Sequence, residues 1–152
     1  MEDVTHGSLS QPLGRIFSRT AKLFLKLIHE KLGNLDIERS YYGLILIDSG
    51  RGLLTQKELA DYLEIDKVSV VRIVDYLTGK GYVKRVINSI DRRKYSLTLT
   101  DKAQEKLPEI KAVMEEVTII AYEGLTEMQK TAFISLLDIV KNNLSKANNS
   151  GL

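Results

Sequence analysis

The stretch from Thr55 to Leu99 reads TQKELADYLEIDKVSVVRIVDYLTGKGYVKRVINSIDRRKYSLTL, and it decides the fold. Its first half has the apolar spacing of two short helices, and its second half changes to the two-residue alternation of strands. Each predicted helix has a start signal: Thr55 and Glu58 form a capping-box pattern, and Asp66 is placed to cap the next helix. Two short helices joined by a tight turn and followed by a hairpin predict a winged helix-turn-helix.

The second short helix, predicted from Lys67 to about Gly79, has an apolar face and a mixed face. The apolar positions, spaced as i, i+3, i+4 and i+7, are Val70, Ile73, Val74 and Leu77. The opposite arc carries Val68, Val71, Arg72 and Asp75, with Lys67 and Ser69 at its leading end. An arginine on this arc matches the O6 and N7 acceptors of guanine, and a surface salt bridge is the alternative. For the two valines, contact with thymine methyl groups and packing beneath the hairpin both stay open.

The predicted hairpin has strands at Tyr82–Ile87 and Lys94–Leu99, and its connecting loop is basic. We expect Tyr95, Leu97 and Leu99 to share the inward face of the second strand. Between Lys80 and Lys94 there are six basic residues and one acidic residue, which is the composition of a patch that meets phosphate. An arginine at the loop tip can clamp a phosphate or enter a narrow minor groove, although an ordinary solvated surface has a similar composition.

The flanking sequence predicts four longer helices around this segment. One amphipathic helix starts at Leu13 and ends at Gly33-Asn34, and Asp36 is expected to cap another that runs to about Asp48. Thr100 caps a fifth helix, in which Pro108 predicts a kink, and a capping box at Thr126 opens the last one. We expect the tail, 146–152, to fray. The wide apolar stripes of these helices exceed what a small winged lobe covers, so a second copy of the chain is the expected partner.

Composition excludes several classes of function. The chain has 152 residues with no cysteine and two histidines, so thiol chemistry and a histidine-rich metal site are excluded. No nucleophile–base pair or phosphate-cradling glycine loop stands out, and we expect neither a catalytic site nor a cofactor. The first eleven residues are polar and no apolar run approaches ~20 residues, so we expect a cytoplasmic protein with no membrane partner.

Taken together, these motifs resemble the MarR-type (multiple antibiotic resistance) regulators over about Leu13 to Leu144. The matching pieces, in order, are Thr55-Gln56-Lys57-Glu58-Leu59-Ala60, Asp66-Lys67, Arg72, Val74-Asp75, Leu77, Gly81-Tyr82-Val83, Asp91-Arg92-Arg93 and Leu97-Thr98-Leu99-Thr100. The resemblance implies a mainly α fold of six helices with a two- to three-stranded antiparallel wing, built as an intertwined homodimer that binds a pseudo-palindromic duplex. It also implies that Arg92 or Arg93 reaches DNA while Asp91 steadies the loop.

The predicted organisation is one domain over 1–152, with dimerisation helices at 11–33 and 100–145 and a DNA-binding lobe at 36–99. The side chains expected to contact DNA are Thr55, Gln56, Lys67, Val68, Ser69, Val71, Arg72, Asn88, Ser89, Arg92, Arg93 and Lys94. In this family small aromatic or anionic effectors bind between the dimer helices and the lobe. The conceivable contacts here are Arg15, His29, Arg39, Tyr41 and Tyr42, and ordinary packing is the alternative for the two tyrosines.

This sequence departs from the family pattern in three places. Val68 and Val71 stand where relatives often carry small hydroxyl residues, so the preferred operator should differ. The wing lacks the proline of many relatives, and the absence of cysteine removes peroxide sensing. We expect a repressor of transcription that a small molecule releases from DNA. The alternative is a winged-helix module that binds another protein and has no affinity for DNA.

Overall fold

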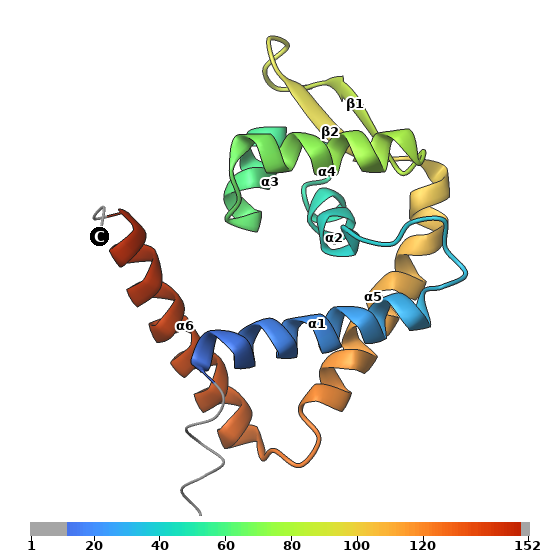
Figure 1. Cartoon of the computed structure of the whole chain (residues 1–152). Coiled ribbons are helices and arrows are strands. Elements are labelled where there is room, and N and C mark those ends of the chain that lie inside the picture. Colours follow the sequence, from blue (N-terminus) through green and yellow to red (C-terminus); the bar gives the residue numbers. More distant parts are fainter. Residues whose placement is uncertain (1–11, 150–152) are drawn as a thin grey trace, which may run out of the picture. The chain divides into compact units, whose positions relative to one another are not determined.

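The computed structural model describes residues 12–149 and confirms the predicted element order (Figure 1). The elements are α1 (Leu13–Lys31), α2 (Tyr41–Ser49), α3 (Gln56–Leu63), α4 (Lys67–Gly79), β1 (Val83–Ile87), β2 (Tyr95–Leu99), α5 (Asp101–Ala121) and α6 (Glu127–Asn149). The polar segment 1–11, including the predicted start of the first dimerisation helix at residue 11, lies outside the described residues.

The described residues divide into two compact units, one ending at Val117 and one starting at Thr118. The core of the first unit contains the predicted inward line of α4: Val70, Val74 and Leu77 are buried and Ile73 is partly buried against them. Leu44, Leu59 and Leu97 bring α2, α3 and β2 into the same core. The apolar spacing that was used to orient α4 therefore gives its buried face correctly.

The start of α2 is a correction to the sequence analysis. Asp36 does not cap this helix, which begins at Tyr41 after Ser40 in a left-handed conformation (φ 67°). The Asp36 carboxylate instead accepts hydrogen bonds from Tyr82 and Lys102, and Ile37 is completely buried. The Asp36 carboxylate thus bonds to side chains 46 and 66 residues away and not to the backbone at the start of a helix.

The wing is a two-stranded antiparallel hairpin in which Val83 pairs with Leu99 and Ile87 with Tyr95. Each strand starts one residue later than predicted. An isolated bridge between Thr55 and Ser96 provides the only further strand-like pairing among residues 12–149, and there the Leu97 amide donates to the Leu54 carbonyl at 2.7 Å. The base of the wing is therefore attached to the backbone that leads into α3.

The last two helices start as predicted. The Thr100 hydroxyl accepts from the Ala103 amide, and Pro108 lies inside α5; the kink expected there stays a prediction. In the second unit, the Thr126 amide donates to the Gln129 side chain at 2.9 Å and the Gln129 amide donates back to the Thr126 hydroxyl at 3.2 Å. The expected fraying from residue 146 is wrong as far as Asn149, because α6 continues to that residue.

Candidate nucleic-acid interface

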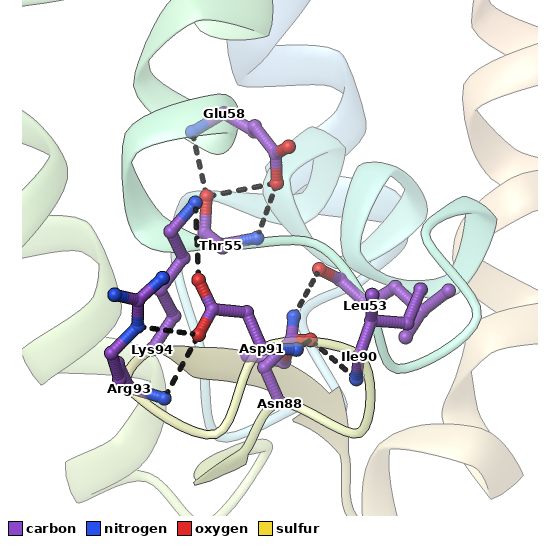
Figure 2. Close-up of polar contacts among 9 residues, drawn as sticks. Leu53, Thr55, Glu58, Asn88, Ile90, Asp91, Arg93 and Lys94 are labelled. Carbon is purple, nitrogen blue, oxygen red and sulfur yellow. Dashed lines mark hydrogen bonds and ion pairs between the residues drawn. The ribbon is translucent and has the colours of Figure 1, made fainter.

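Two capped helices form the frame of the candidate interface. At the start of α3, the Thr55 amide and hydroxyl each donate to the Glu58 carboxylate at 2.8 Å, and the Glu58 amide donates to the Thr55 hydroxyl oxygen at 3.2 Å (Figure 2). The bonds from Thr55 lower the pKa of the Glu58 carboxyl below its usual value. This network occupies the Thr55 hydroxyl, so its role as a cap is shown and its contact with DNA stays a prediction.

The cap of α4 involves a second predicted contact residue. The Ser69 amide and hydroxyl donate to the two Asp66 carboxylate oxygens at 2.8 and 2.6 Å. These bonds lower the pKa of Asp66, with the Ser69 hydroxyl as the largest cause. Asp66 therefore holds both the helix start and the Ser69 side chain at the leading end of α4.

The outward arc of α4 carries the side chains that sequence reasoning placed there. Val68 is 61% exposed, Lys67 and Arg72 are exposed, and Val71 is half-buried. Among residues 12–149, Arg72 has no hydrogen-bond or ion-pair partner, so the salt bridge considered as its alternative role is not formed there. The arc thus presents one free guanidinium group beside one exposed valine.

Arg85 ties this arc to the wing, and sequence reasoning missed it. Its guanidinium group donates to Asp75 at 2.8 Å and to Gln56 at 3.1 Å, which links β1 to both α4 and the first residue of α3. The hairpin register contains a signal for this contact, because Arg85 pairs with Leu97 and cross-strand partners share a face. Since Leu97 was expected to face the core, Arg85 had to point toward the helices as well.

Asn88 was predicted to contact DNA, and the structure corrects this assignment. Its side chain is 7% exposed, and its amide nitrogen donates to the Ser96 hydroxyl at 2.7 Å and to the Leu53 carbonyl at 3.3 Å. Its amide oxygen accepts from the Ile90 and Asp91 amides, both at 2.9 Å. Asn88 is therefore the internal support of the wing loop (Figure 2).

The predicted brace between Asp91 and the loop arginines is present on one arginine. An Asp91 carboxylate oxygen accepts from the Arg93 amide at 3.1 Å and from its Nε at 3.2 Å, and Lys94 Nζ lies 3.9 Å from the other oxygen (Figure 2). The Arg93 bonds lower the pKa of Asp91. Arg92 is exposed and has no such partner among residues 12–149, and Ser89 is exposed in the same loop. The loop thus carries Arg92 without a side-chain partner among residues 12–149 and Arg93 held in place by Asp91.

The wing also exposes apolar side chains. Ile90 is 80% exposed, and the cross-strand pair Ile87 and Tyr95 is exposed as well. This corrects the expectation that Tyr95 faces inward with Leu97 and Leu99, because the start of β2 extends beyond the core that covers those two leucines. A hollow of about 440 Å³ lies under Tyr95, and its lining residues are Thr55, Gln56, Lys57, Arg85, Lys94, Tyr95 and Leu97.

The structure gives the five conceivable effector contacts different surroundings. Arg15 lines a hollow formed by α1 residues alone, which includes none of the other four. Arg39 lies over the Tyr76 ring, with its guanidinium carbon 4.3 Å from the ring centre. Tyr41 is buried and its hydroxyl donates to the Ile37 carbonyl at 2.9 Å, which bears out the packing role considered for it. His29 and Tyr42 are exposed.

Two further properties of residues 12–149 concern metal binding and membranes. Residues 12–149 hold no group of three or more histidine, cysteine, aspartate or glutamate side chains that could bind a metal ion. None of the described helices is long and apolar enough to cross a membrane.

Comparison with known proteins identifies the winged segment. Residues 38–94 match the model of the MarR family, and this range contains α2, α3, α4, β1 and the wing loop. The winged lobe is thus similar to the MarR family. The MarR-like chain is also similar to solved transcriptional regulators along most of its length, which extends the likeness beyond the matched segment.

Three solved structures illustrate that likeness. The transcriptional repressor CouR bound to a 23-mer DNA duplex is 25% identical, with a TM-score of 0.74 over 92% of this chain and 99% of that one. CouR from Rhodococcus jostii RHA1 bound to p-coumaroyl-CoA is 24% identical, with a TM-score of 0.74 over 88% and 94%. The apo form of MarR from E. coli is 26% identical, with a TM-score of 0.63 over 86% and 97%.

Proposed function

We propose that this protein is a transcriptional repressor that binds double-stranded DNA of specific sequence as a homodimer and is released by a small-molecule effector. The observation that carries the proposal is the outward arc of α4, where Arg72 is exposed and unpaired within the lobe that matches the MarR family. We assign it no catalytic role, and as a regulator of transcription it would act in the cytoplasm.

In this proposal α4 contacts the bases, and the wing contacts the backbone or the minor groove. Helix α4 enters the major groove, where the Arg72 guanidinium group donates two hydrogen bonds to guanine and Val68 packs against a thymine methyl group. Arg92 and Arg93 at the wing contact a phosphate or the adjacent minor groove. Lys57 and Lys94 beside the start of α3 add positive charge where the helix amides already favour a phosphate.

Exposed apolar surface supports the homodimer. Helix α6 has no buried residue in this structure, and Met128, Leu136 and Ile139 on it are exposed, as are Leu13 and Leu23 on α1. Apolar surface of this extent on long helices favours coverage by a partner chain. A symmetric pair would place its recognition helices about one DNA turn apart, ~34 Å, and so select an inverted repeat.

The proposed effector binds near the start of α2. The structure of CouR with p-coumaroyl-CoA supports an aromatic, anionic small molecule as the class of ligand. Arg39 and Tyr42, both exposed next to or in the first turn of α2, are the contacts that we favour. Binding there would release DNA if it shifted the lobe, because a change in the separation of the two α4 helices weakens simultaneous binding.

Selection of bound duplexes from a random pool tests the proposed function. An enriched inverted repeat is expected from the wild-type chain. Arg72→Ala should lose base preference at one symmetric position, at a cost of about 1–3 kcal/mol there, whereas Lys106→Ala on α5 should keep the same repeat. A pool without enrichment would overturn the proposal and favour the protein-binding module.

A further inference from the structure

The turn that follows α4 is hydrogen-bonded to Thr100, the residue that precedes α5. The Tyr82 amide donates to the Leu77 carbonyl at 2.9 Å, and Gly81 between them has a positive φ of 76°. The Thr100 amide donates to the Tyr82 carbonyl at 3.0 Å, and its hydroxyl donates to the Gly81 carbonyl at 2.6 Å. These bonds join the turn after α4 to the residue before α5. They do not by themselves set the angle between the two helices, which also depends on the side chains packed around this junction.

One ammonium group lies at the centre of those side chains. Lys102 Nζ donates to Asp36 Oδ2 at 2.6 Å and to the Lys80 carbonyl at 2.8 Å, and it lies 4.6 Å from the centre of the Tyr82 ring. The Tyr82 hydroxyl donates to the other Asp36 oxygen at 2.6 Å. We call this set, Asp36, Lys80, Tyr82 and Lys102, the Lys102 clasp. It connects the segment before α2, the end of α4 and the first turn of α5.

The clasp joins two partly exposed charged side chains, Lys102 at 43% and Asp36 at 52%, to a buried ring and a helix end. The Tyr82 side chain is 1% exposed, and the Lys80 carbonyl that accepts from Lys102 belongs to the C-cap residue of α4. A cation at the C-terminus of a helix also interacts favourably with the partial negative charge of its last carbonyls. The lysine therefore links the C-terminus of α4 to the first turn of α5.

We propose that Lys102 is a positioning residue that sets the angle between α4 and α5, and thereby the half-site spacing that the dimer accepts on DNA. The inference rests on the proposed function, because it needs two copies of α4 bound to one duplex. The angle at α5 matters since α5 belongs to the predicted dimerisation helices, 100–145. A small rotation at this junction moves the far end of α4 and changes the distance between the two copies. Lys102 touches no base in this account and acts through the helix that does.

The experiment compares the full-length chain with Lys102→Met and Asp36→Asn in selections from a pool of inverted repeats whose spacer varies by single base pairs. Lys106→Met, one turn further along α5, is the matched control. The wild type and the control should prefer one spacing. We expect both clasp variants to accept neighbouring spacings, with the preference for the best spacing reduced by at least about threefold and the half-site sequence unchanged.

The outcomes separate this proposal from the one on which it rests. A wild-type pool without an enriched repeat would overturn the proposed function and this inference together. An enriched repeat with the same sharp spacing preference in both clasp variants would overturn the inference alone. An equal loss of affinity at every spacing, together with a lower melting temperature, would show a purely structural lysine and would also overturn it. Lys102→Arg, which keeps the charge, should restore the spacing preference if the other variants fold poorly.

Discussion

The guanidinium group of Arg85 lies 2.8 Å from the carboxylate of Asp75, on the arc of α4 that faces away from the core. This ion pair does two things at once. It neutralises the acidic side chain closest in sequence to Arg72 on that arc, and it connects the first strand of the wing to the helix that the proposal places in the major groove.

Removal of this link should weaken DNA binding more than folding. Arg85→Ala leaves the Asp75 carboxylate unpaired next to the phosphates, and we expect affinity to fall about tenfold through repulsion. The pair is partly exposed, so stability should change by less than about 1 kcal/mol. Fluorescence anisotropy with a labelled duplex measures the first effect and thermal unfolding the second. The double variant Arg85→Ala with Asp75→Asn should recover much of the affinity. Lys84→Ala, on the opposite face of the hairpin, is the control for loss of one positive charge from the wing.

The two wing arginines should differ in their contribution to salt dependence. Arg92 has no partner among residues 12–149, whereas the Nε of Arg93 is bonded to Asp91. Each phosphate contact that is lost should reduce the slope of log affinity against log salt by about 0.9. We expect Arg92→Ala to reduce the slope by about 0.9 for each wing, or about 1.8 for the dimer, in titrations from low to moderate salt. An unchanged slope for Arg92→Ala with a reduced slope for Arg93→Ala would reverse the assignment.

Asn88 should be a stability residue with an indirect effect on binding. Asn88→Ala removes four hydrogen bonds and leaves the Ser96 hydroxyl buried without its partner. The cost of such a buried unsatisfied group is about 1–3 kcal/mol, which urea denaturation can measure. Ser89→Ala, the exposed neighbour, should leave the free energy of unfolding unchanged. If Asn88→Ala unfolds like the wild type, the loop has another support.

Acid should destabilise the protein in part through Asp36. Hydrogen bonds from Lys102 and Tyr82 lower the pKa of this carboxyl from 3.8 to about 2. Because the folded pKa is depressed, the stabilisation is fully present well above pH 3.8 and is lost as the pH falls toward 2. Urea denaturation of the wild type from pH 6 to pH 2 should therefore show a steeper loss of stability than Asp36→Asn. Parallel curves for the two proteins would contradict the depressed pKa.

The features that the sequence predicts well depend on residues close together in the chain. Thr55 with Glu58 and Asp66 with Ser69 are separated by three positions, and the apolar line of α4 repeats within one helix. These local signals are sufficient to place α3, α4 and the order of the elements. They are also sufficient to place Arg72 and Val68 on the outward arc.

The errors occur where a distant partner determines the outcome. Asp36 has the local sequence pattern of a helix cap, but its carboxylate accepts hydrogen bonds from Tyr82 and Lys102, far along the chain. Asn88 resembles a polar loop contact, but Ser96 and the Leu53 carbonyl bury its amide. Tyr95 follows the alternation of its strand and is nevertheless exposed, because alternation shows which residues share a face and does not show how far the core extends.

The wing is attached to the rest of the lobe at its base, where the Leu97 amide donates to the Leu54 carbonyl, the Asn88 side chain donates to the Leu53 carbonyl and Arg85 bonds to Asp75. None of these attachments uses the side chains of Ile90 or Arg92 at the tip. Ile90 and Arg92 are therefore positions where mutation during evolution can alter the DNA sites recognised while the scaffold folds as before, so related regulators could diverge in their target genes through changes at this tip alone.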